Sequence, residues 1–238
     1  MLNASAPGDV FSLHPFRGGR IAITIPFYME HVDILIPPNF EKSGVVKPID
    51  EAFEAGDWVG TFNFWIIQRS PVPSIVYQQR SPKSTWAPGK LDVSAGGHYS
   101  AGETLLDGLR EVQEELGRTY PADQVHSLGR RLNVSFDTKG RRRNSVVSLY
   151  YTFDDSALET YVLQEAEVHA ICACSIDALL KLHANELDRF EVEGIKANGE
   201  KTQIEVTRDT FPENWDGYHQ KMAQVAQRLI AGEKNVMY

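Results

Sequence analysis

Cysteine is scarce in this chain, with only two among 238 residues. Two thiols cannot hold together a disulfide-rich scaffold, and no partner residues stand at the fixed spacing that a structural zinc site needs. Cys172 and Cys174 alternate within an apolar run, so a strand there would turn both side chains to the same face of a sheet. We expect both to be buried free thiols.

Long apolar runs are also missing, and no stretch is long enough to span a bilayer. Pro7, Gly8 and Asp9 fall where a signal peptide would need an uninterrupted apolar core. We therefore expect neither secretion nor membrane insertion, and a cytoplasmic location. A content of 42% hydrophobic and 24% charged residues is ordinary for a globular protein and argues against general disorder.

Positive charge is in deficit, since the formal net charge at pH 7 is −8. Sequence-independent affinity for nucleic acid comes from Lys and Arg side chains that neutralise phosphates, so we do not expect a nucleic-acid partner. The one dense basic cluster, residues 139–143, lies between strand-like segments at residues 132–136 and 146–153. A hairpin turn displayed in water is the favoured interpretation, and contact with phosphate or RNA is the alternative.

Glycine and glutamate are concentrated in one place. Residues 96–103 form a glycine-rich loop that leads into a helical pattern carrying Glu111, Glu114 and Glu115. A helix advances about 100° per residue, so the three carboxylates share one arc and are expected to converge. Carboxylates this close raise one another's pKa, and a hard cation removes that penalty. Magnesium fits such a site because it takes oxygen ligands and binds substrate phosphates.

The other features of this segment support a helix packed on a sheet. An apolar stripe with helical spacing is formed by Leu105, Leu109, Val112 and Leu116. Thr104 and Asp107 predict a capping box at its start, and Gly117 is placed to end it. A glycine inside a helix costs about 1 kcal/mol relative to alanine, so we expect the backbone to pack closely at Gly108.

A simpler interpretation is that the three glutamates form only the solvated face of an amphipathic helix, as charge runs on helices usually do. The glycines before the helix favour a ligand site instead. They allow backbone amides and carbonyls to approach a ligand, which a purely structural helix entry does not require.

The segment resembles the Nudix box, whose pattern is a glycine, five residues, a glutamate, seven residues, Arg-Glu, an aliphatic residue, any residue, Glu-Glu, any residue and a glycine. The matching positions are Gly97, Glu103, Arg110, Glu111, Val112, Glu114, Glu115 and Gly117. The chain departs from the pattern in one place, because six residues separate Glu103 from Arg110. The resemblance implies a metal-dependent hydrolase of diphosphates that uses Mg²⁺, with Mn²⁺ as the alternative ion.

The resemblance extends beyond the box, to Nudix proteins related to isopentenyl diphosphate isomerase. Upstream it rests on residues 78–81, Lys83, Trp86, residues 88–95 and the earlier segments 30–35 and 56–58. Downstream it rests on residues 164–168 and on a strand through Cys174 followed by residues 175–180. Together the likeness covers residues 29–190.

The pattern of strands and helices predicts a protein of the α/β or α+β class, with a sheet sandwiched between helices. The resemblance implies an α/β/α sandwich of the Nudix type around a mixed sheet. Strand-like runs occupy residues 20–25, 61–67, 74–79, 146–153 and 168–174. Residues 176–183 have helical spacing, and Asn198-Gly199 predicts a hairpin between residues 193–196 and 202–206. A final helical pattern is formed by Trp215, Tyr218, Met222, Val225, Leu229 and Ile230.

This organisation predicts one catalytic domain with two appendages. Residues 1–28 form an N-terminal extension with a strand, residues 29–190 the Nudix domain, and residues 191–238 a C-terminal hairpin and helix. The last helix is expected to pack on the domain or on a second copy in a homodimer.

The expected activity is hydrolysis of a pyrophosphate bond in a small-molecule diphosphate, a nucleoside diphosphate linked to another group or a related compound. We expect Glu111, Glu114 and Glu115, with the Gly96 carbonyl, to hold the metal ion, and Arg110 and Glu103 to belong to the catalytic set. One of the helix glutamates or Glu167 would accept the proton of the attacking water. Substrate contacts are expected from Gly97 and from the basic residues Arg69, Arg80, Lys83 and Lys90, each of which also fits a solvated surface charge.

Two other functions stay open. An isopentenyl diphosphate isomerase is, by family resemblance, expected to carry a cysteine in a strand before the box and a histidine-rich metal site, and residues 61–67 contain no cysteine. A sensor with this fold would bind a nucleotide without cleaving it, although such proteins often lose box glutamates that this chain keeps.

Overall fold

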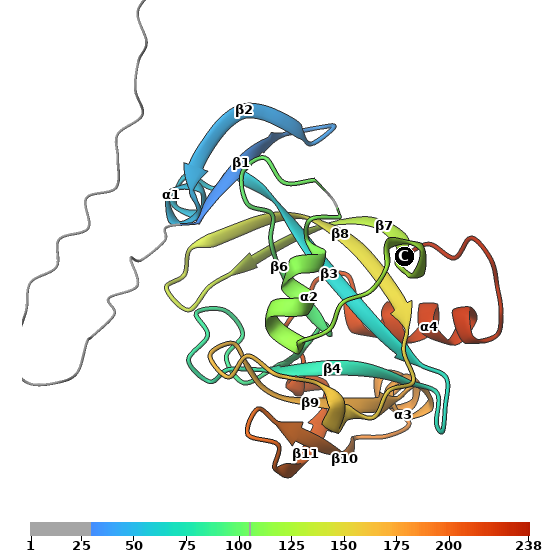
Figure 1. Ribbon diagram of the computed structural model, residues 1–238. Coiled ribbons are helices and arrows are strands. Elements are labelled where there is room, and N and C mark those ends of the chain that lie inside the picture. The colour runs from blue at the N-terminus through green and yellow to red at the C-terminus, as the bar shows by residue number, and fades with distance from the viewer. Residues whose placement is uncertain (1–29, 105) are drawn as a thin grey trace, which may run out of the picture.

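The computed structural model describes residues 30–104 and 106–238 (Figure 1). The strand expected at residues 20–25 and the stripe residue Leu105 lie outside the described residues. The strands are β1 (His31–Ile36), β2 (Glu41–Pro48), β3 (Trp58–Gln68), β4 (Ser74–Arg80), β5 (Leu91–Asp92), β6 (Ala95–His98), β7 (His126–Phe136), β8 (Arg142–Phe153), β9 (Val168–Ser175), β10 (Arg189–Lys196) and β11 (Lys201–Thr207). The α-helices of the described part are α1 (Ile49–Ala55), α2 (Leu109–Leu116), α3 (Ile176–His183) and α4 (Tyr218–Ile230).

The sheet is largely antiparallel. Its main path runs β11-β10-β9-β4-β3-β1-β2, with β5 beside β4, β6 and β8 beside β3, and β7 beside β8. Among the described strands, β3 and β8 form the parallel pair, in register from Trp58 opposite Asn144 to Ile67 opposite Phe153. The fold is therefore α+β, and the mixed character of the predicted sheet comes from this single pairing.

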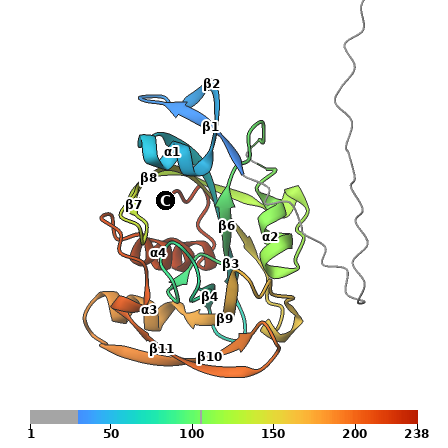
Figure 2. The same ribbon diagram turned by 90° about the vertical axis from the view of Figure 1, so that its left-hand side faces the viewer.

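Strand β3 carries the core on both of its faces, because successive side chains of a strand point to opposite sides. Trp65 and Ile67 enter one hydrophobic cluster, which also contains the buried side chains of α3 and α4. Phe62 and Phe64 enter a second cluster, with residues of α2. Figure 2 shows the same division, with α2 on one side of β3 and α3 and α4 on the other.

Helix α2 is shorter than the sequence pattern predicts. The predicted capping box does form hydrogen bonds, since Thr104 donates to the Asp107 carboxylate, but both residues lie in the turn before the helix. Gly108 occupies the N-cap, and a Cβ atom there would lie 2.5 Å from the Phe62 ring. The expected close packing at Gly108 is confirmed, and this contact with the sheet coincides with the place where the regular helix begins. Gly117 ends the helix as predicted, with φ of +63°.

The predictions for the second half of the chain are largely confirmed. Helix α3 coincides with residues 176–183, and β10 and β11 form a hairpin whose turn contains Gly199 at φ of +83°. Helix α4 buries Tyr218, Met222, Val225 and Leu229 in the core. Trp215 was wrongly assigned to that stripe, because it precedes the helix and is 73% exposed.

The structure confirms the prediction that the two cysteines are buried free thiols. Cys172 and Cys174 lie on β9 with both side chains in the same core cluster, and their sulfur atoms are 3.8 Å apart as free thiols. None of the helices in the described residues has the length and hydropathy needed to cross a membrane.

Candidate functional site

Strand β6 brings the glycine-rich segment against the acidic helix. It pairs with β3, placing Gly97 opposite Phe62 and Gly96 opposite Asn63. The Gly96 N–H donates to Glu115 Oε2 at 2.9 Å, and Gln78 Nε2 donates to the same oxygen at 3.3 Å. Glu115 is only 2% exposed, so these donors compensate a carboxylate that burial would otherwise leave unpaired.

Gly97 is required by the position of Glu111. A Cβ atom on Gly97 would lie 2.3 Å from Glu111 Oε1, so any larger residue would force the glutamate side chain to move away. Glycine at this position therefore leaves space for a carboxylate directly on the strand backbone.

The guanidinium of Arg110 contacts four residues of the site. Its Nε donates to Glu103 Oε1 at 2.7 Å, and its Nη1 lies 2.8 Å from Glu111 Oε1 and 3.2 Å from Glu114 Oε2. Its Nη2 donates to the His98 carbonyl at 3.2 Å. Glu103 is fixed in turn by the Ser100 N–H, which donates to its Oε2 at 2.7 Å. The shorter spacing between Glu103 and Arg110 is therefore compatible with a direct ion pair between them.

The glutamates lie in a negative, desolvated environment. Burial raises the pKa of Glu111 to about 7, and the charges of Glu114, Glu167 and Glu30 act in the same direction while Arg110 opposes them. Burial also raises the pKa of Glu115 well above its usual range, against the hydrogen bond from Gly96. Both effects disfavour the ionised carboxylates, so a bound cation would stabilise the site.

The three box glutamates do not gather as the helical arc predicts. Glu111 and Glu115 face β6, whereas the Glu114 side chain is 53% exposed and contacts Arg110. Across residues 30–104 and 106–238, no three His, Cys, Asp or Glu side chains are grouped as a metal site. Arg110 accounts for this arrangement, because its guanidinium pairs with two of the carboxylates that would otherwise repel one another.

The chemistry of the donors nevertheless fits a hard divalent cation. The available ligands are the carboxylate oxygens of Glu111 and Glu115, both desolvated, with the backbone of Gly97 against Glu111. Glu167 lies three residues after Gln164, whose N–H donates to the Glu115 carbonyl near the end of α2 at 3.0 Å. The Glu167 charge acts on both Glu111 and Glu115, so this carboxylate lies near the site as the sequence analysis expects.

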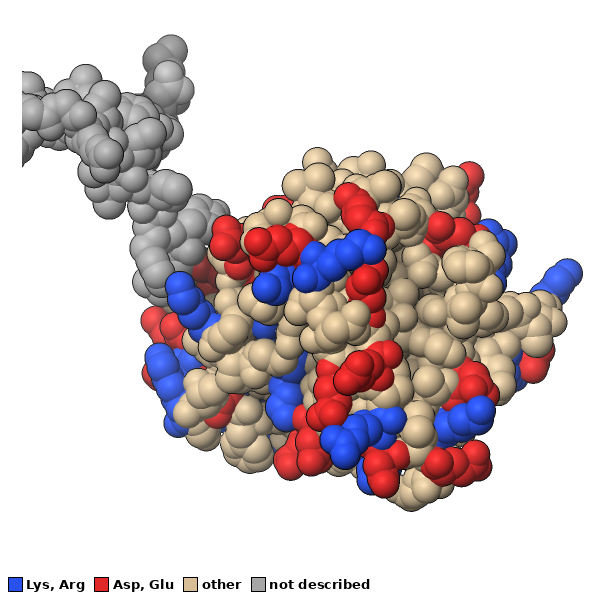
Figure 3. All heavy atoms as spheres, turned by 90° about the horizontal axis from the view of Figure 1, so that it is seen from below, with Lys and Arg blue, Asp and Glu red and all other residues tan. Residues whose placement is uncertain are grey.

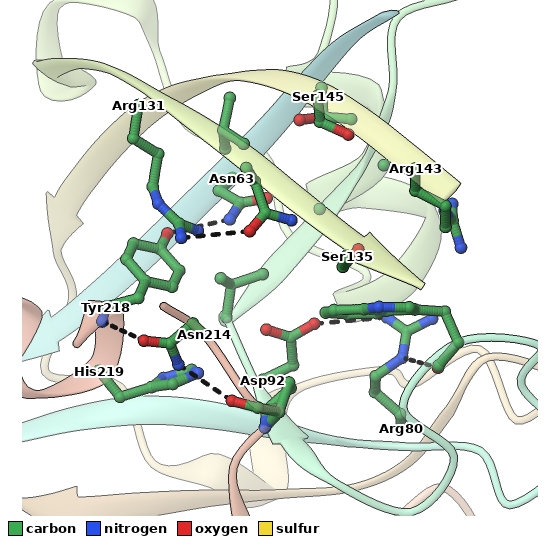
Figure 4. Close-up of a pocket in the computed structure, with 18 of the residues that line it drawn as sticks. Asn63, Arg80, Asp92, Arg131, Ser135, Arg143, Ser145, Asn214, Tyr218 and His219 are labelled. Atoms are coloured by element: carbon green, nitrogen blue, oxygen red, sulfur yellow. Dashed lines mark hydrogen bonds and ion pairs between the residues drawn. The ribbon is translucent and has the colours of Figure 1, made fainter. Parts of the chain in front are cut away.

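A cavity adjoins this site and is lined in part by the glycine strand (Figure 4). It measures about 770 Å³, its open mouth included. Gly96, Gly97 and His98 line it together with residues of β3, β7 and β8, and the segment before α4 contributes Pro212, Glu213 and Asn214. The C-terminal appendage is therefore one wall of the cavity.

The predicted basic residues divide into two groups. Arg80 lines the cavity, stacks over the Trp86 ring at 5.1 Å, and lies 3.6 Å from Asp92. Arg69, Lys83 and Lys90 do not line it. Arg69 lies beyond the far end of β3 and pairs with Asp155, Lys83 is exposed in a loop, and Lys90 donates to the Asp209 carbonyl. Their expected substrate contacts are not supported by these positions.

Arg143 and His98 are site residues that the sequence pattern did not predict. Arg143 Nη2 lies 3.0 Å from His98 Nε2, and its guanidinium stacks over Phe53 at 4.4 Å. Burial, with the charges of Arg143, Arg80 and Arg110, lowers the pKa of His98 to about 3. The ring is therefore neutral at pH 7, and its Nε2 accepts the hydrogen bond from Arg143. The alternation of side chains along β8 was the available signal, since it separates Arg143 from exposed Arg142.

The molecular surface carries mixed charges. On the face shown in Figure 3, acidic and basic side chains are interspersed, and no continuous basic field is seen there.

Comparison with known proteins identifies the family. The model of the NUDIX domain matches residues 61–192, more than half of the chain. An uncharacterized Nudix hydrolase of Clostridium acetobutylicum is 29% identical over 178 residues, which cover 73% of this chain and 86% of the relative. Nudix hydrolase 3 of Arabidopsis thaliana is 34% identical over 146 residues, 60% of this chain but only 19% of that longer protein.

A crystal structure of a Deinococcus radiodurans protein matches with a TM-score of 0.48 and 24% identity, covering 66% of this chain and 90% of the other. The family match itself rests on the domain model, whose range includes most of β3, all of β6 and α2, and the cavity arginines Arg80 and Arg143. The chain belongs to the Nudix hydrolase superfamily.

Proposed function

We propose that this chain hydrolyses the pyrophosphate bond of a nucleoside diphosphate linked to another group, or of a related diphosphate, with magnesium as the cofactor. One observation carries the proposal. Glu111 and Glu115 are both desolvated and lie against the backbone of Gly97 and Gly96. A cation bound there would compensate the negative charge of the two carboxylates.

The residues would divide the work as follows. Glu111 and Glu115, with Glu114 and the Gly96 carbonyl, would hold the metal ion, which supplies charge neutralisation for phosphate oxygens and a lowered pKa for a bound water. Arg110 orients Glu111 and Glu114 through its ion pairs and is itself oriented by Glu103. Glu167, exposed on the neighbouring loop, is the candidate to accept a proton from water.

The isomerase alternative has less support. The likeness to the isopentenyl diphosphate isomerase branch stays a prediction, since the comparisons identify the superfamily alone. Both cysteines are buried in the core on β9, and neither lines the cavity beside the glycine strand. Proton transfer on carbon by a thiol would need one of them at the site.

The experiment is a magnesium-supplemented screen of nucleotide sugars, nucleoside di- and triphosphates, dinucleoside polyphosphates and thiamine diphosphate, with detection of released phosphates. The wild-type protein should hydrolyse at least one compound, and Glu115→Gln should lose most of that turnover while remaining folded. Glu51→Gln, on the exposed side of α1, is the matched control and should keep it. Full activity of Glu115→Gln would refute the proposal, and binding without cleavage by the wild type would favour the sensor.

A further inference from the structure

Strand β7 forms an open edge of the sheet. Within the described residues it pairs with β8 alone, so its other side presents backbone groups that no strand there contacts. Two segments reach the ends of this edge, since the Tyr238 N–H donates to the Leu128 carbonyl and the Thr138 N–H donates to the Thr85 carbonyl, both at 3.0 Å. The edge between Leu128 and Thr138 is therefore available to a further strand, and its midpoint is Asn133.

The side chains of β7 that point away from the cavity are apolar. Arg131 and Ser135 line the cavity (Figure 4), and successive side chains of a strand point to opposite faces. The alternate positions therefore form a stripe on the outer face of β7. Its members are 40%, 38% and 65% exposed, and they are Leu132, Val134 and Phe136.

Two further apolar side chains extend this stripe at its ends. Trp215 lines a groove together with Val134 and Phe136. At the other end, Met237 is 60% exposed, and its Cε would lie 2.9 Å from a Cβ atom on Gly129. Soluble monomers rarely expose large contiguous apolar patches, so this surface, which we call the β7 patch, indicates a protein interface.

The two ends of the main path of the sheet are protected against strand addition, whereas β7 is not. Strand β2 carries two lysines and ends at Pro48, and β11 begins at Lys201 and contains Glu205. Charged residues and proline on an edge strand oppose pairing with another chain. Residues 132–136 of β7 contain neither.

The open stretch of β7 is complementary to a second copy of itself. Antiparallel pairing about a two-fold axis at Asn133 places Leu132 opposite Val134 of the partner subunit. The same register places Arg130 opposite Phe136 of the partner subunit. The first pair is apolar, and the second brings a guanidinium to an aromatic ring. No two like charges stand opposite each other in this register, so charge does not oppose the pairing.

We propose that two copies of this chain form a dimer by antiparallel pairing of their β7 strands about Asn133. The paired strands form backbone hydrogen bonds, and contacts between Leu132 and Val134 of the partner subunit remove part of the β7 patch from water. Helix α4, which the sequence allows as a dimer element, buries its apolar side chains in the core of its own chain instead. The proposal does not rest on hydrolase activity, and it is tested without turnover.

The first test measures the mass of the full-length chain in solution by light scattering after size-exclusion chromatography. The wild type should be a dimer. Val134→Asp should raise the dissociation constant of the dimer by about 100-fold or more, because each dimer then withdraws two carboxylates from water. Val72→Asp makes the same change at an exposed residue between β3 and β4 and should leave the dimer intact.

Three results of this test would overturn the proposal. They are a wild type that is monomeric at every concentration, a Val134→Asp dimer as stable as that of the wild type, and an equal loss of the dimer in Val72→Asp.

The second test examines the register by cysteine cross-linking and does not depend on Val134→Asp folding. Opposite Cα atoms of antiparallel strands are about 4.5–5.5 Å apart, within the range that a disulfide spans. Asn133→Cys treated with oxidised glutathione should therefore give a covalent dimer on a non-reducing gel. The native Cys172 and Cys174 are buried and should not react.

Arg130→Cys is the matched control for the cross-link. It lies on the same strand at an exposed position, but in the proposed register the two copies are six positions apart, about 20 Å along the strands. It should stay uncross-linked under the same conditions. Absence of a covalent dimer in Asn133→Cys, or equal cross-linking of both variants, would overturn the pairing of β7 about Asn133.

Discussion

The carboxylate of Glu115 accepts a hydrogen bond from the backbone N–H of Gly96 at 2.9 Å. This contact joins the acidic helix α2 to the short strand β6, with the side chain almost fully buried at 2% exposure. A solvated face of an amphipathic helix would not place a glutamate in this way, because burial of a carboxylate is costly unless it is compensated. The relationship therefore favours a ligand site over a purely structural helix.

Gly97→Ala should reduce turnover more than stability. The added Cβ would lie 2.3 Å from Glu111 Oε1, and the flexible glutamate side chain is the part that moves. Displacing a catalytic group by about 1 Å can cost about 100-fold in rate, so we expect a loss of that order with a melting temperature close to wild type. Steady-state kinetics and thermal unfolding of the same preparation check this. Wild-type turnover in this variant would show that the position of Glu111 does not matter.

Gly108→Ala should show the opposite pattern. Its Cβ would lie 2.5 Å from the Phe62 ring, inside the core between α2 and β3. Overpacking of this kind costs about 1–3 kcal/mol, so the denaturation midpoint should fall. Turnover per folded molecule should change much less than in Gly97→Ala. A variant as stable as wild type would contradict the close packing that begins the helix at Leu109.

Arg110→Lys should weaken magnesium activation. Lysine keeps the charge, but it is a single ammonium and cannot reproduce contacts to Glu103, Glu111 and Glu114 from three nitrogens. Positioning groups next to metal ligands typically contribute about 10-fold or more to metal affinity or activity. The half-maximal magnesium concentration should rise accordingly. Arg228→Lys, at an exposed pair with Glu233, is the control and should leave it unchanged.

His219 should make the stability of the protein depend on pH. Burial, with the charges of His183 and Arg131, lowers its pKa to about 3, from an ordinary value of 6.5. Between these values the unfolded chain binds the proton and the folded chain does not, so the free energy of unfolding falls as the pH falls below 6.5. This contribution is fully present above pH 6.5 and is reduced by about 2 kcal/mol at pH 5.

Urea denaturation at pH 7 and pH 5 checks this dependence. His219→Gln should lose less stability than the wild type between the two pH values, because it no longer takes up that proton on unfolding. His126→Gln changes an exposed histidine and should follow the wild type. Identical pH dependence in wild type and His219→Gln would contradict the neutral, buried state of His219.

The regular part of the fold could be predicted because its pattern is local. Residues 61–67, 74–79 and 168–174 are apolar runs of strand length, and each lies within an observed strand. Residues 176–183 carry a helical stripe after Ser175, whose Oγ accepts the Ala178 N–H. The sequence pattern and the structure agree here because the apolar side chains that recur with strand or helix spacing are also the ones that fill the core.

The site was only partly predictable, because its key contacts join distant segments. The start of α2 depends on Phe62 of β3, more than forty residues earlier, which the capping box at Thr104 does not reveal. Arg143 was grouped with a solvated basic run, although the strand turns it toward His98. Arg69 follows the end of β3 and Arg80 ends β4, and the two look alike in sequence, but only Arg80 lines the cavity.

The arrangement of the box glutamates was likewise only partly predictable from the sequence. Helical spacing places Arg110 and Glu114 one turn apart, and the two side chains pair at 3.2 Å. Helical spacing does not predict that Arg110 also forms an ion pair with Glu111, or that Glu115 accepts a hydrogen bond from the Gly96 N–H. Three carboxylates on one arc can take several arrangements, and the partners on β6 decide among them.

Removing the metal should abolish activity reversibly. EDTA should stop hydrolysis of any substrate found in the screen, and added magnesium or manganese should restore it, because the desolvated carboxylates alone provide no positive charge for the phosphates. Activity that persists in EDTA would require a different catalytic group.

The most direct measurement is the anomalous diffraction of a crystal soaked in manganese. An ion bound by Glu111 and Glu115 beside the Gly96–Gly97 backbone, and missing in Glu115→Gln, is the predicted result. Anomalous density elsewhere, with both carboxylates turned to bulk solvent, would contradict the account.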